Sequence, residues 1–343
     1  MLDKTLLEKL LSTHSPSGYE LNIQKLLIKE LSNVSEGIIT NQNYNLINYI
    51  NKDAKTKILL LTHIDEIGLV INKIYDNGTC RVENIGAIRP HMYAGQHVKV
   101  LNNGKEIPGV FGYTPNMDNL KTTNLILDLG TNSKEETQKL VEIGCPVIVD
   151  RTYTYLANNH LAAKALDDKL AVYIGAEVLK RCKNKTNHGI YLASTVGEET
   201  TGRGASASVQ QVKPTCCICI DVTYATDINY RENLTNDVSL GKGVCLTEGS
   251  LMNKLLHKRF KEICQNKNIP YQMEVSPSRT YTDSDSVFNY FTSTPTYLIS
   301  IPLRYMHSSV EVCNLDDVEN IINLITEFVL TLEDNFNLNP FNE

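Results

Sequence analysis

Several apolar runs of this chain end directly in a charged or imidazole side chain. The run at residues 57–62 is nearly all apolar, as expected for a strand covered on both faces of a parallel or mixed sheet, and His63 follows it at once. The run at 189–195 is equally apolar, and Glu198 and Glu199 come just after it. Ligands in open α/β sheets gather at the carboxyl ends of the strands, so this pattern predicts an α/β protein with a site at that edge.

The hydrophobic pattern changes between about residues 71 and 157. Short alternating runs at 79–85, 96–101 and 106–113 are separated by turn signals, which predicts a small β-rich domain containing one helix over 133–143. The α/β pattern on either side predicts a mixed sheet sandwiched by helices. At 343 residues the chain is long for one core. We therefore predict a catalytic α/β domain formed by residues 1–70 and 158–343, interrupted by an inserted β-rich domain at 71–157.

The composition restricts the partners of the chain. With 33 Lys and Arg against 39 Asp and Glu the net charge is −6, and no basic stripe is present, so no nucleic-acid partner is expected. No apolar run approaches the ~20 residues of a membrane span, so no membrane partner is expected either.

The start of the chain and the cysteines bear on localisation. The first residues form an amphipathic pattern with charges throughout, which is not that of a secretory signal. The nine cysteines are an odd number, and without such a signal they favour reduced thiols and a cytoplasmic localisation. Cys216, Cys217 and Cys219 lack the paired C-x-x-C spacing of a zinc ribbon, so we interpret them as small buried hydrophobes.

His63 and Asp65 form the first candidate pair. A lone histidine at a strand end is more often a satisfied polar residue than a metal ligand. Residues two apart on an extended segment point the same way, so Asp65 can lie beside the imidazole and hold its tautomer. The pair favours a metal-binding histidine supported by a carboxylate.

Asp167 and Asp168 precede a helix expected over 169–182. The helix dipole alone explains acidic residues at this position. Together with a histidine at a nearby strand end, one of these carboxylates is well placed to bridge two cations.

Glu198 and Glu199 divide naturally between two roles. If the backbone is still extended there, adjacent side chains point to opposite sides. One glutamate can then bind a metal ion while the other takes a proton from the attacking water, the division that metal-assisted hydrolysis requires.

Asp221 and His307 complete the candidate ligands. Asp221 closes the apolar run at 215–220, where an unpaired buried charge would cost several kcal/mol, and a cation would remove that cost. His307 follows a strand expected over 295–301 and a turn at Pro302. Carboxylates and imidazoles without cysteine suit Zn²⁺, Co²⁺ or Mn²⁺. Two such ions about 3.5–4 Å apart would polarise a carbonyl and activate water together.

Five motifs, in this order, resemble the M42 family of dinuclear metallo-aminopeptidases. That family includes glutamyl, deblocking and tetrahedral-shell enzymes, and some members carry the name endoglucanase M. The resemblance covers nearly the whole chain. The motifs are His63-Ile-Asp-Glu-Ile-Gly68, Ala165-Leu-Asp-Asp-Lys169, Glu198-Glu199 through Gly204-Ala205, Asp221-Val222-Thr223 and Ile301-Pro-Leu-Arg-Tyr-Met-His307.

The resemblance implies two divalent metal ions per subunit, with zinc first and cobalt or manganese as alternatives. It implies that His63 and Asp221 bind one ion and that Glu199 and His307 bind the other. Asp167 would bridge the two ions.

The resemblance also implies the catalytic roles and the assembly. Glu198 would be the general base, Asp65 the carboxylate behind His63, and the peptide bond between Asp167 and Asp168 would be cis. The β-rich insertion would be a barrel-like dimerisation domain, whose dimers often assemble into a hollow dodecamer.

The chain departs from the family after the glutamate pair. The family commonly has Val-Gly-Leu-Arg-Gly-Ala there, whereas this chain has Thr200-Thr201-Gly202-Arg203-Gly204-Ala205. Moving a glycine changes where φ > 0 is easily reached, so the shape of this loop and the substrate preference are not carried over.

The function predicted from the sequence is removal of N-terminal residues from short peptides. An N-acyl amino acid deacylase or deblocking enzyme is the enzymatic alternative, since the same metal pair suits any amide. A catalytically inactive shell-forming or binding protein is the alternative from another class. A glycosidase is disfavoured because that chemistry uses two carboxylates flanking a sugar rather than carboxylates bound to metals. The preferred N-terminal residue, the native metal and the size of the oligomer stay open.

Overall fold

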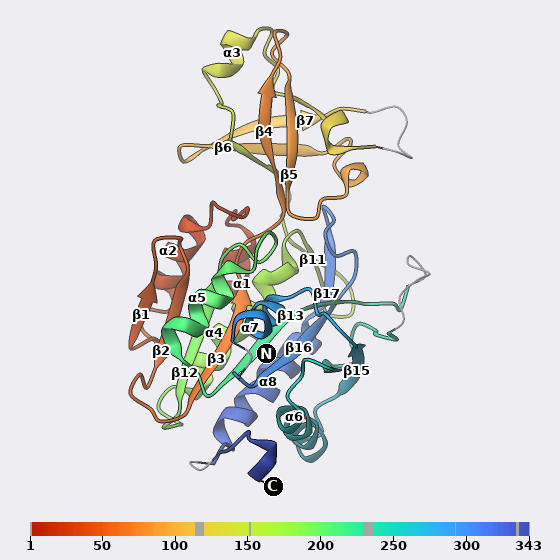
Figure 1. Cartoon of the computed structure of the whole chain (residues 1–343). Coiled ribbons are helices and arrows are strands. Elements are labelled where there is room, and N and C mark those ends of the chain that lie inside the picture. The colour runs from red at the N-terminus through yellow and green to blue at the C-terminus, as the bar shows by residue number, and fades with distance from the viewer. Residues whose placement is uncertain are drawn as a thin grey trace.

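The chain folds into a large α/β body and a smaller β body above it (Figure 1). The computed structural model describes residues 2–113, 120–150, 152–228, 236–291, 293–333 and 336–342. The predicted fold class, a mixed sheet between helices with an inserted barrel-like β domain, is confirmed.

An eight-stranded sheet forms the centre of the large body, in the order β1-β2-β12-β3-β13-β16-β14-β15. Its strands in that order are Gly37–Thr40, Leu46–Ile50, Gly189–Thr195, Lys57–His63, Cys216–Tyr224, Thr296–Leu303, Val244–Gly249 and Tyr271–Ser276. The four central strands β12, β3, β13 and β16 run parallel. β2 pairs antiparallel with β1 and β12, and β14 pairs antiparallel with β16 but parallel with β15. The sheet is therefore mixed, with a parallel centre.

The parallel centre explains the continuous apolar runs of the sequence. Every residue of β12 and of β16 is buried, as expected for strands covered by helices on both faces. In the register of β12 with β3, Thr195 lies opposite His63. The carboxyl ends of these strands therefore meet at one edge of the sheet.

Helices cover both faces of this sheet. On one face α4 and α8 pack against each other and against the central strands, with α1 and α6 beside them. On the other face α5 and α7 pack together over β3, β12 and β16 (Figure 1). The α-helices are α1 Thr5–Leu11, α2 Leu21–Glu30, α3 Lys134–Gln138, α4 Leu166–Cys182, α5 Arg203–Val212, α6 Lys254–Lys267, α7 Asp283–Tyr290 and α8 Leu315–Leu330. None of these helices has both the length and the apolar character needed to cross a membrane.

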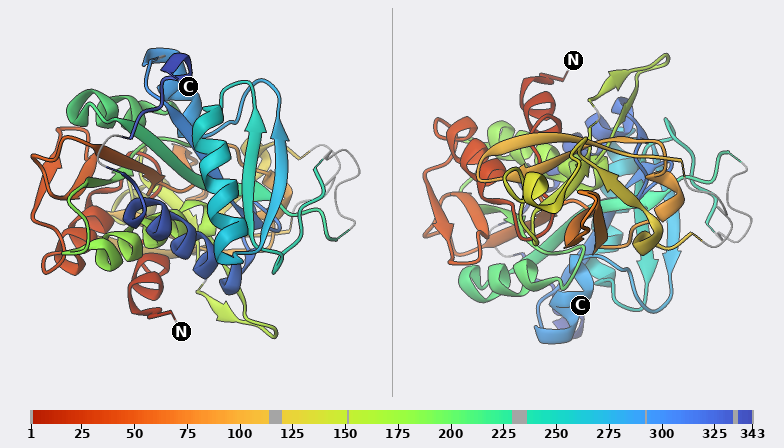
Figure 2. Two further views of the ribbon diagram at one scale, coloured as in Figure 1. Left: turned by 90° about the horizontal axis from the view of Figure 1, so that it is seen from below. Right: turned by 90° about the horizontal axis from the view of Figure 1, so that it is seen from above.

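The smaller body is a closed barrel with the strand order β4-β5-β8-β7-β6-β9. These strands are β4 Gly68–Ile74, β5 Cys80–Ile85, β8 Ile126–Asp128, β7 Lys105–Phe111, β6 His97–Asn102 and β9 Pro146–Val149. It has its own apolar core, which includes Leu69, Val82 and Val147. Seen from above, the barrel lies in front of the α/β body (Figure 2). Because β4 begins soon after β3 ends, the barrel stands at the edge where the parallel strands terminate.

A small third sheet packs against the α/β body. It has the order β10-β11-β17, with β10 Thr154–Tyr155, β11 His160–Ala163 and β17 Glu311–Asn314. Short 3-10 helices complete the described structure at Pro90–Met92, Thr122–Asn124 and Pro340–Asn342.

Two local predictions are wrong. The helix expected over 133–143 is only α3, which Ser133 caps by accepting a hydrogen bond from the Glu136 amide. The turn expected at Pro302 is absent because this residue lies inside β16. There β16 still pairs with β13, while its pairing with β14 is confined to Ile299 and Ser300, so a proline without an amide hydrogen is tolerated.

The interpretation of the cysteines is confirmed. All nine are free and buried, including Cys216, Cys217 and Cys219 on β13. They act as small apolar residues of the core.

Candidate metal centre

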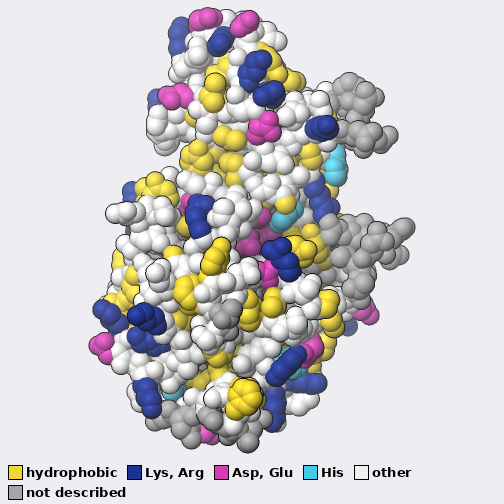
Figure 3. All heavy atoms as spheres, in the orientation of Figure 1, with side chains coloured by type: hydrophobic (Ala, Val, Ile, Leu, Met, Phe, Trp, Pro, Cys, Tyr) yellow, Lys and Arg dark blue, Asp and Glu magenta, His cyan; other side chains and the backbone are white. Residues whose placement is uncertain are grey.

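The predicted ligands gather at the carboxyl edge of the parallel strands. Figure 3 shows acidic side chains with a histidine beside them on the face below the barrel. Each predicted ligand comes from a different element: His63 ends β3, Asp167 lies at the start of α4, Glu199 follows β12, Asp221 lies on β13, and His307 follows β16. The fold thus brings together residues that are far apart in the chain.

The first group of ligand atoms comes from His63, Asp167 and Asp221. These atoms all lie within 4.8 Å of one another, and all three residues are buried. His63 Nε2 is 3.0 Å from Asp167 Oδ1.

The second group comes from Asp167, Glu199 and His307, again with ligand atoms within 4.8 Å of one another. His307 Nε2 is 3.2 Å from Asp167 Oδ2 and 3.5 Å from Glu199 Oε2. The two carboxylate oxygens of Asp167 therefore face different histidines. Asp167 is the residue that the two groups share.

The backbone around Asp167 is irregular. Asp167 and Asp168 have non-helical dihedral angles although they fall within α4, and the preceding Ala165 is left-handed at φ 54°. The peptide bond between Asp167 and Asp168 is cis, as the family resemblance implied. This irregular segment turns the Asp167 carboxylate toward both histidines.

Glu311 is a residue of the site that the sequence did not suggest. Its Oε2 accepts a hydrogen bond from the Asp167 amide at 3.1 Å, and its Oε1 accepts one from the His307 amide at 2.9 Å. One buried carboxylate thus holds the backbone at two candidate ligands. No sequence pattern marks it, because its partners are main-chain amides.

The glutamate pair lies in a turn rather than on an extended segment. The amides of Thr201 and Gly202 both donate to the Gly197 carbonyl, at 2.9 and 2.8 Å. The premise of an extended backbone is therefore wrong. The side chains still diverge: Glu198 Oε2 is 3.9 Å from His63, and Glu199 Oε2 faces His307.

Asp65 fixes this turn. Its Oδ1 accepts a hydrogen bond from the Glu198 amide at 3.0 Å, and its Oδ2 accepts bonds from the Glu199 amide at 3.3 Å and from Ser17 Oγ at 2.6 Å. Toward His63, the nearest atom to Nδ1 is the Asp65 backbone oxygen at 3.1 Å, with the carboxylate at 3.6 Å. Asp65 therefore supports both the imidazole and the glutamate pair.

The acids of the site resist ionisation when no cation is present. Burial, with repulsion from neighbouring carboxylates, raises the pKa values of Glu198, Glu199 and Asp168 well above their usual range. Burial and the nearby Asp167 raise the pKa of Asp221 and that of Glu311 to about 8. So many buried acids in one place are costly unless positive charge accompanies them.

The pKa shifts of the histidines and of the shared aspartate favour their charged forms instead. Burial alone would lower the pKa of His63, but its hydrogen bonds with Asp167 and Asp65 raise it. Burial would raise the pKa of Asp167, yet its contacts with His307 and His63 bring it below the usual range. The shared carboxylate is therefore favoured in its ionised form.

The donor set fits a pair of divalent cations of intermediate hardness. It offers imidazole nitrogens and carboxylate oxygens, and no cysteine is present among the residues of the two groups. Buried, mutually repelling carboxylates around a shared aspartate are what two adjacent cations would neutralise.

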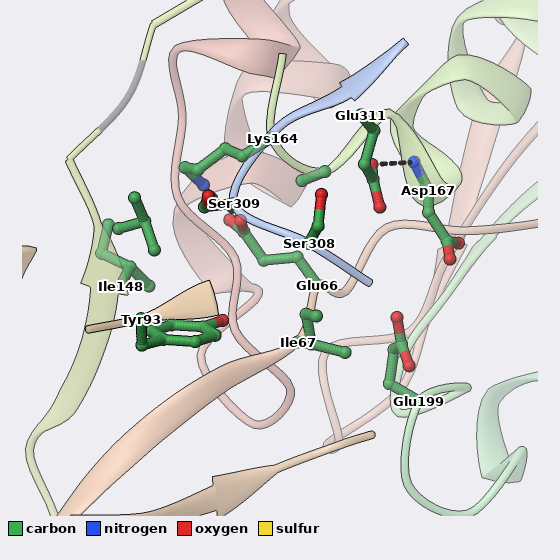
Figure 4. A pocket seen from close by; sticks show the side chains of 12 residues that line it. Glu66, Ile67, Tyr93, Ile148, Lys164, Asp167, Glu199, Ser308, Ser309 and Glu311 are labelled. Atoms are coloured by element: carbon green, nitrogen blue, oxygen red, sulfur yellow. Dashed lines mark hydrogen bonds and ion pairs between the residues drawn. The ribbon is translucent and has the colours of Figure 1, made fainter. Parts of the chain in front are cut away.

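A pocket opens beside the two groups of ligands (Figure 4). Asp167, Glu199 and Glu311 lie at one end, while Lys164 and Glu66 lie at the other. Barrel residues, among them Tyr93 and Ile148, contribute to its wall. A molecule in this pocket would contact both bodies of the protein.

The chain matches a family model described as M42 glutamyl aminopeptidase over residues 45–324. It is 30% identical over 335 residues to the lysyl aminopeptidase of Pyrococcus furiosus, covering 94% of this chain and 96% of that protein.

The fold of this chain is also similar to solved peptidase structures. Aminopeptidase APDkam598 from the archaeon Desulfurococcus kamchatkensis is 30% identical, with a TM-score of 0.89 over 96% of this chain and 94% of that one. The TET1 peptidase of Pyrococcus horikoshii, which can assemble into a tetrahedron or a large octahedral shell, is 26% identical. Its TM-score is 0.85 over 95% of this chain and 99% of that one.

Proposed function

This chain belongs to the M42 peptidase family, and from that premise we propose that it is an aminopeptidase that uses two divalent cations to remove N-terminal residues from short peptides. Zinc is the first candidate, with cobalt and manganese as alternatives, because the donors are imidazoles and carboxylates.

One observation carries the proposal: two groups of candidate ligands share Asp167. His63 and Asp221 would hold one cation, and Glu199 and His307 the other. A carboxylate with one oxygen facing each histidine is suited to bridge them. Two cations bridged in this way would supply Lewis acidity that polarises the peptide carbonyl and lowers the pKa of water.

The protein's own residues would then move the proton. Glu198 is a carboxylate that belongs to neither group, and its Oε2 lies 3.9 Å from His63 Nε2. It would accept a proton from the attacking water and return it to the nitrogen of the leaving peptide. Asp65 would keep Glu198 in place through the Glu198 amide.

Assembly and localisation complete the proposal. We expect a homo-oligomer built from dimers through the barrel, with a dodecamer as the candidate assembly, in line with the shells formed by the similar TET1 peptidase. Nine free, buried cysteines are consistent with a reducing compartment such as the cytoplasm.

The test is a comparison of substrates and metals. Metal-free protein is supplied separately with Zn²⁺, Co²⁺ and Mn²⁺ and assayed on a peptide library, on aminoacyl-anilides and on N-acetyl amino acids. We expect release of free N-terminal residues only after an ion is added. Turnover of N-acetyl amino acids alone would instead indicate a deacylase, and failure to bind any divalent ion would indicate an inactive shell or binding protein.

Replacing Glu198 by glutamine tests the proposed base. Glu198→Gln keeps the size of the side chain but cannot accept the proton, so kcat should fall by roughly 10²- to 10⁴-fold. Elemental analysis should still find two ions per chain. Peptide turnover at the normal rate would show that another group is the base.

A further inference from the structure

A buried group of charged residues lies beside the candidate metal centre and has no part in the proposed proton transfer. Glu66 is 3% exposed, Lys164 5% and Lys169 0%. Both lysines form ion pairs with the same carboxylate: Lys169 Nζ is 3.0 Å from Glu66 Oε1, and Lys164 pairs with Oε2. Buried ion pairs contribute little net stability, so this group calls for another explanation.

The three residues join two segments of the candidate metal centre. Glu66 comes directly after Asp65, close to the end of β3 at His63. Lys164 and Lys169 lie on either side of Asp167 in the chain. The Glu66 carboxylate therefore connects the end of β3 to both sides of the segment that carries the shared aspartate. Figure 4 shows Glu66 and Lys164 together in the pocket that Asp167 also lines.

The carboxylate itself is anchored to the main chain. Glu66 Oε1 also accepts a hydrogen bond from the Ser15 amide at 2.8 Å, and the Glu66 amide donates to the Ser15 carbonyl at 2.9 Å. Lys169 Nζ donates to the Thr13 carbonyl at 2.8 Å. The segment between α1 and α2 thus fixes Glu66 and Lys169 from the other side.

The segment between the two lysines needs such support. Ala165 is left-handed, and Asp167 and Asp168 depart from helical dihedral angles, so the regular hydrogen bonds of a helix do not fix their positions. Asp167 contacts His63 and His307, Asp168 contacts His63, and Glu311 accepts a hydrogen bond from the Asp167 amide. The ion pairs on either side hold the two ends of this segment to Glu66.

We propose that Glu66, Lys164 and Lys169 are positioning residues that hold Asp167 between His63 and His307. In this position Asp167 completes both groups of ligands at once. The inference rests on the proposed function in one respect, which is that Asp167 binds cations.

The variant Lys164→Met tests this with little risk to the fold. Two lysines share one glutamate, so removing Lys164 leaves the pair of Glu66 and Lys169 balanced in charge. Metal-free protein is titrated with Co²⁺ by calorimetry, and the absorption bands of bound cobalt are recorded in parallel. We expect the affinity for both ions to fall by at least tenfold, because the displaced carboxylate belongs to both groups.

Lys180→Met is the matched control. Lys180 lies on the same helix α4 and pairs with Glu177 at 2.6 Å, but its side chain is 31% exposed and lies outside both groups of ligands. This control should bind two ions as the wild type does.

A purely structural role for Lys164 predicts a different result for Lys164→Met. The unfolding temperature of the metal-free protein would then fall without a change in the affinity for either ion.

The outcomes separate the inference from the proposed function. A wild type that binds no ions contradicts both. A wild type that binds two ions, together with a folded Lys164→Met that binds them equally tightly, overturns the positioning role alone. If Lys164→Met does not fold, Lys169→Met carries the same expectation, since it leaves Glu66 paired with Lys164 and removes the tether on the other side of Asp167.

Discussion

Glu198 and Glu199 are neighbours in the chain that face different partners, Glu198 toward His63 and Glu199 toward His307. The sequence suggested this division by assuming an extended backbone, but a turn held by the Asp65 carboxylate produces it. A turn can thus direct two neighbouring side chains toward different partners, as an extended strand would. What the sequence could predict was the identity of the side chains, which follow apolar strands.

Supporting contacts to the main chain could not be predicted in this way. Glu311 acts through the amides of Asp167 and His307, and Ser17 acts through Asp65. Such contacts depend on which distant loops meet in the folded protein. No local pattern in the sequence indicates these meetings. The metal-binding roles of the five candidate ligands, and the roles of Glu198 and Asp65, stay predictions until ions are observed.

His14 should make the stability of the metal-free protein depend on pH. Burial, with the nearby charge of Lys164, lowers its pKa from 6.5 to about 4. The unfolded chain therefore binds the proton first, and stability is lost as the pH falls from about 6.5 toward 4. His14→Gln cannot take up this proton. The free energy of unfolding that the variant loses over this pH range should therefore be smaller than that of the wild type by on the order of 3 kcal/mol.

Urea unfolding of wild type and His14→Gln at pH 7 and at pH 4.5 measures the effect. Metal-free protein is used because ion binding has its own pH dependence. The free energies of unfolding of the two proteins should differ little at pH 7. Between pH 7 and pH 4.5 the wild type should lose more of its stability than His14→Gln does. An equal loss of unfolding free energy in both proteins between pH 7 and pH 4.5 would contradict the lowered pKa of His14.

At the scale of elements, the parallel strands were the most predictable part of the fold. Lys57–His63 and Gly189–Thr195 are continuous apolar runs because helices cover both faces of the sheet. The strand β14, the edge strand β15 and the helix α7 were not predicted. In β15 the one buried side chain is that of Glu274, and the apolar Met273 and Val275 are exposed, so its apolar pattern is weak. Its place in the sheet comes from pairing with β14, a tertiary contact.

The helix α6 offers a test of local structure away from the candidate metal centre. The Asn253 side chain caps it by accepting hydrogen bonds from the amides of Leu255 and Leu256, at 3.1 and 3.0 Å. Asn253→Ala should lower the free energy of unfolding by about 1 kcal/mol. Thermal unfolding measures the loss, while metal content and peptide turnover should be unchanged. An unaltered unfolding temperature would show that the cap contributes nothing.

At the scale of the whole molecule, the barrel and the α/β body meet beside the candidate metal centre. Pocket residues such as Tyr93 come from the barrel, and Asp167 comes from the α/β body. The division into residues 71–157 and the flanking segments stays a prediction, while the barrel strands themselves run from Gly68 to Val149. The barrel thus contributes to the wall of the site.

The outer surface of the barrel should form the dimer contact. Val110 on β7 and Ile126 on β8 are exposed, at 37% and 42%, on paired strands of the barrel. Light scattering should give a mass that is an even multiple of the 38.5 kDa chain. Changing both residues to glutamate should shift the mass toward one chain, because charge at the centre of an apolar contact is costly. An unchanged mass would place the contact elsewhere.

The most direct test of the account is to locate the ions. Crystals of the protein grown with Zn²⁺ or Co²⁺, with diffraction data collected at the absorption edge of the metal, show each ion as an anomalous peak. We predict two peaks per chain about 3.5–4 Å apart, one beside His63 and Asp221, the other beside Glu199 and His307, with Asp167 contacting both. A single peak, or ions bound away from Asp167, would contradict the central claim.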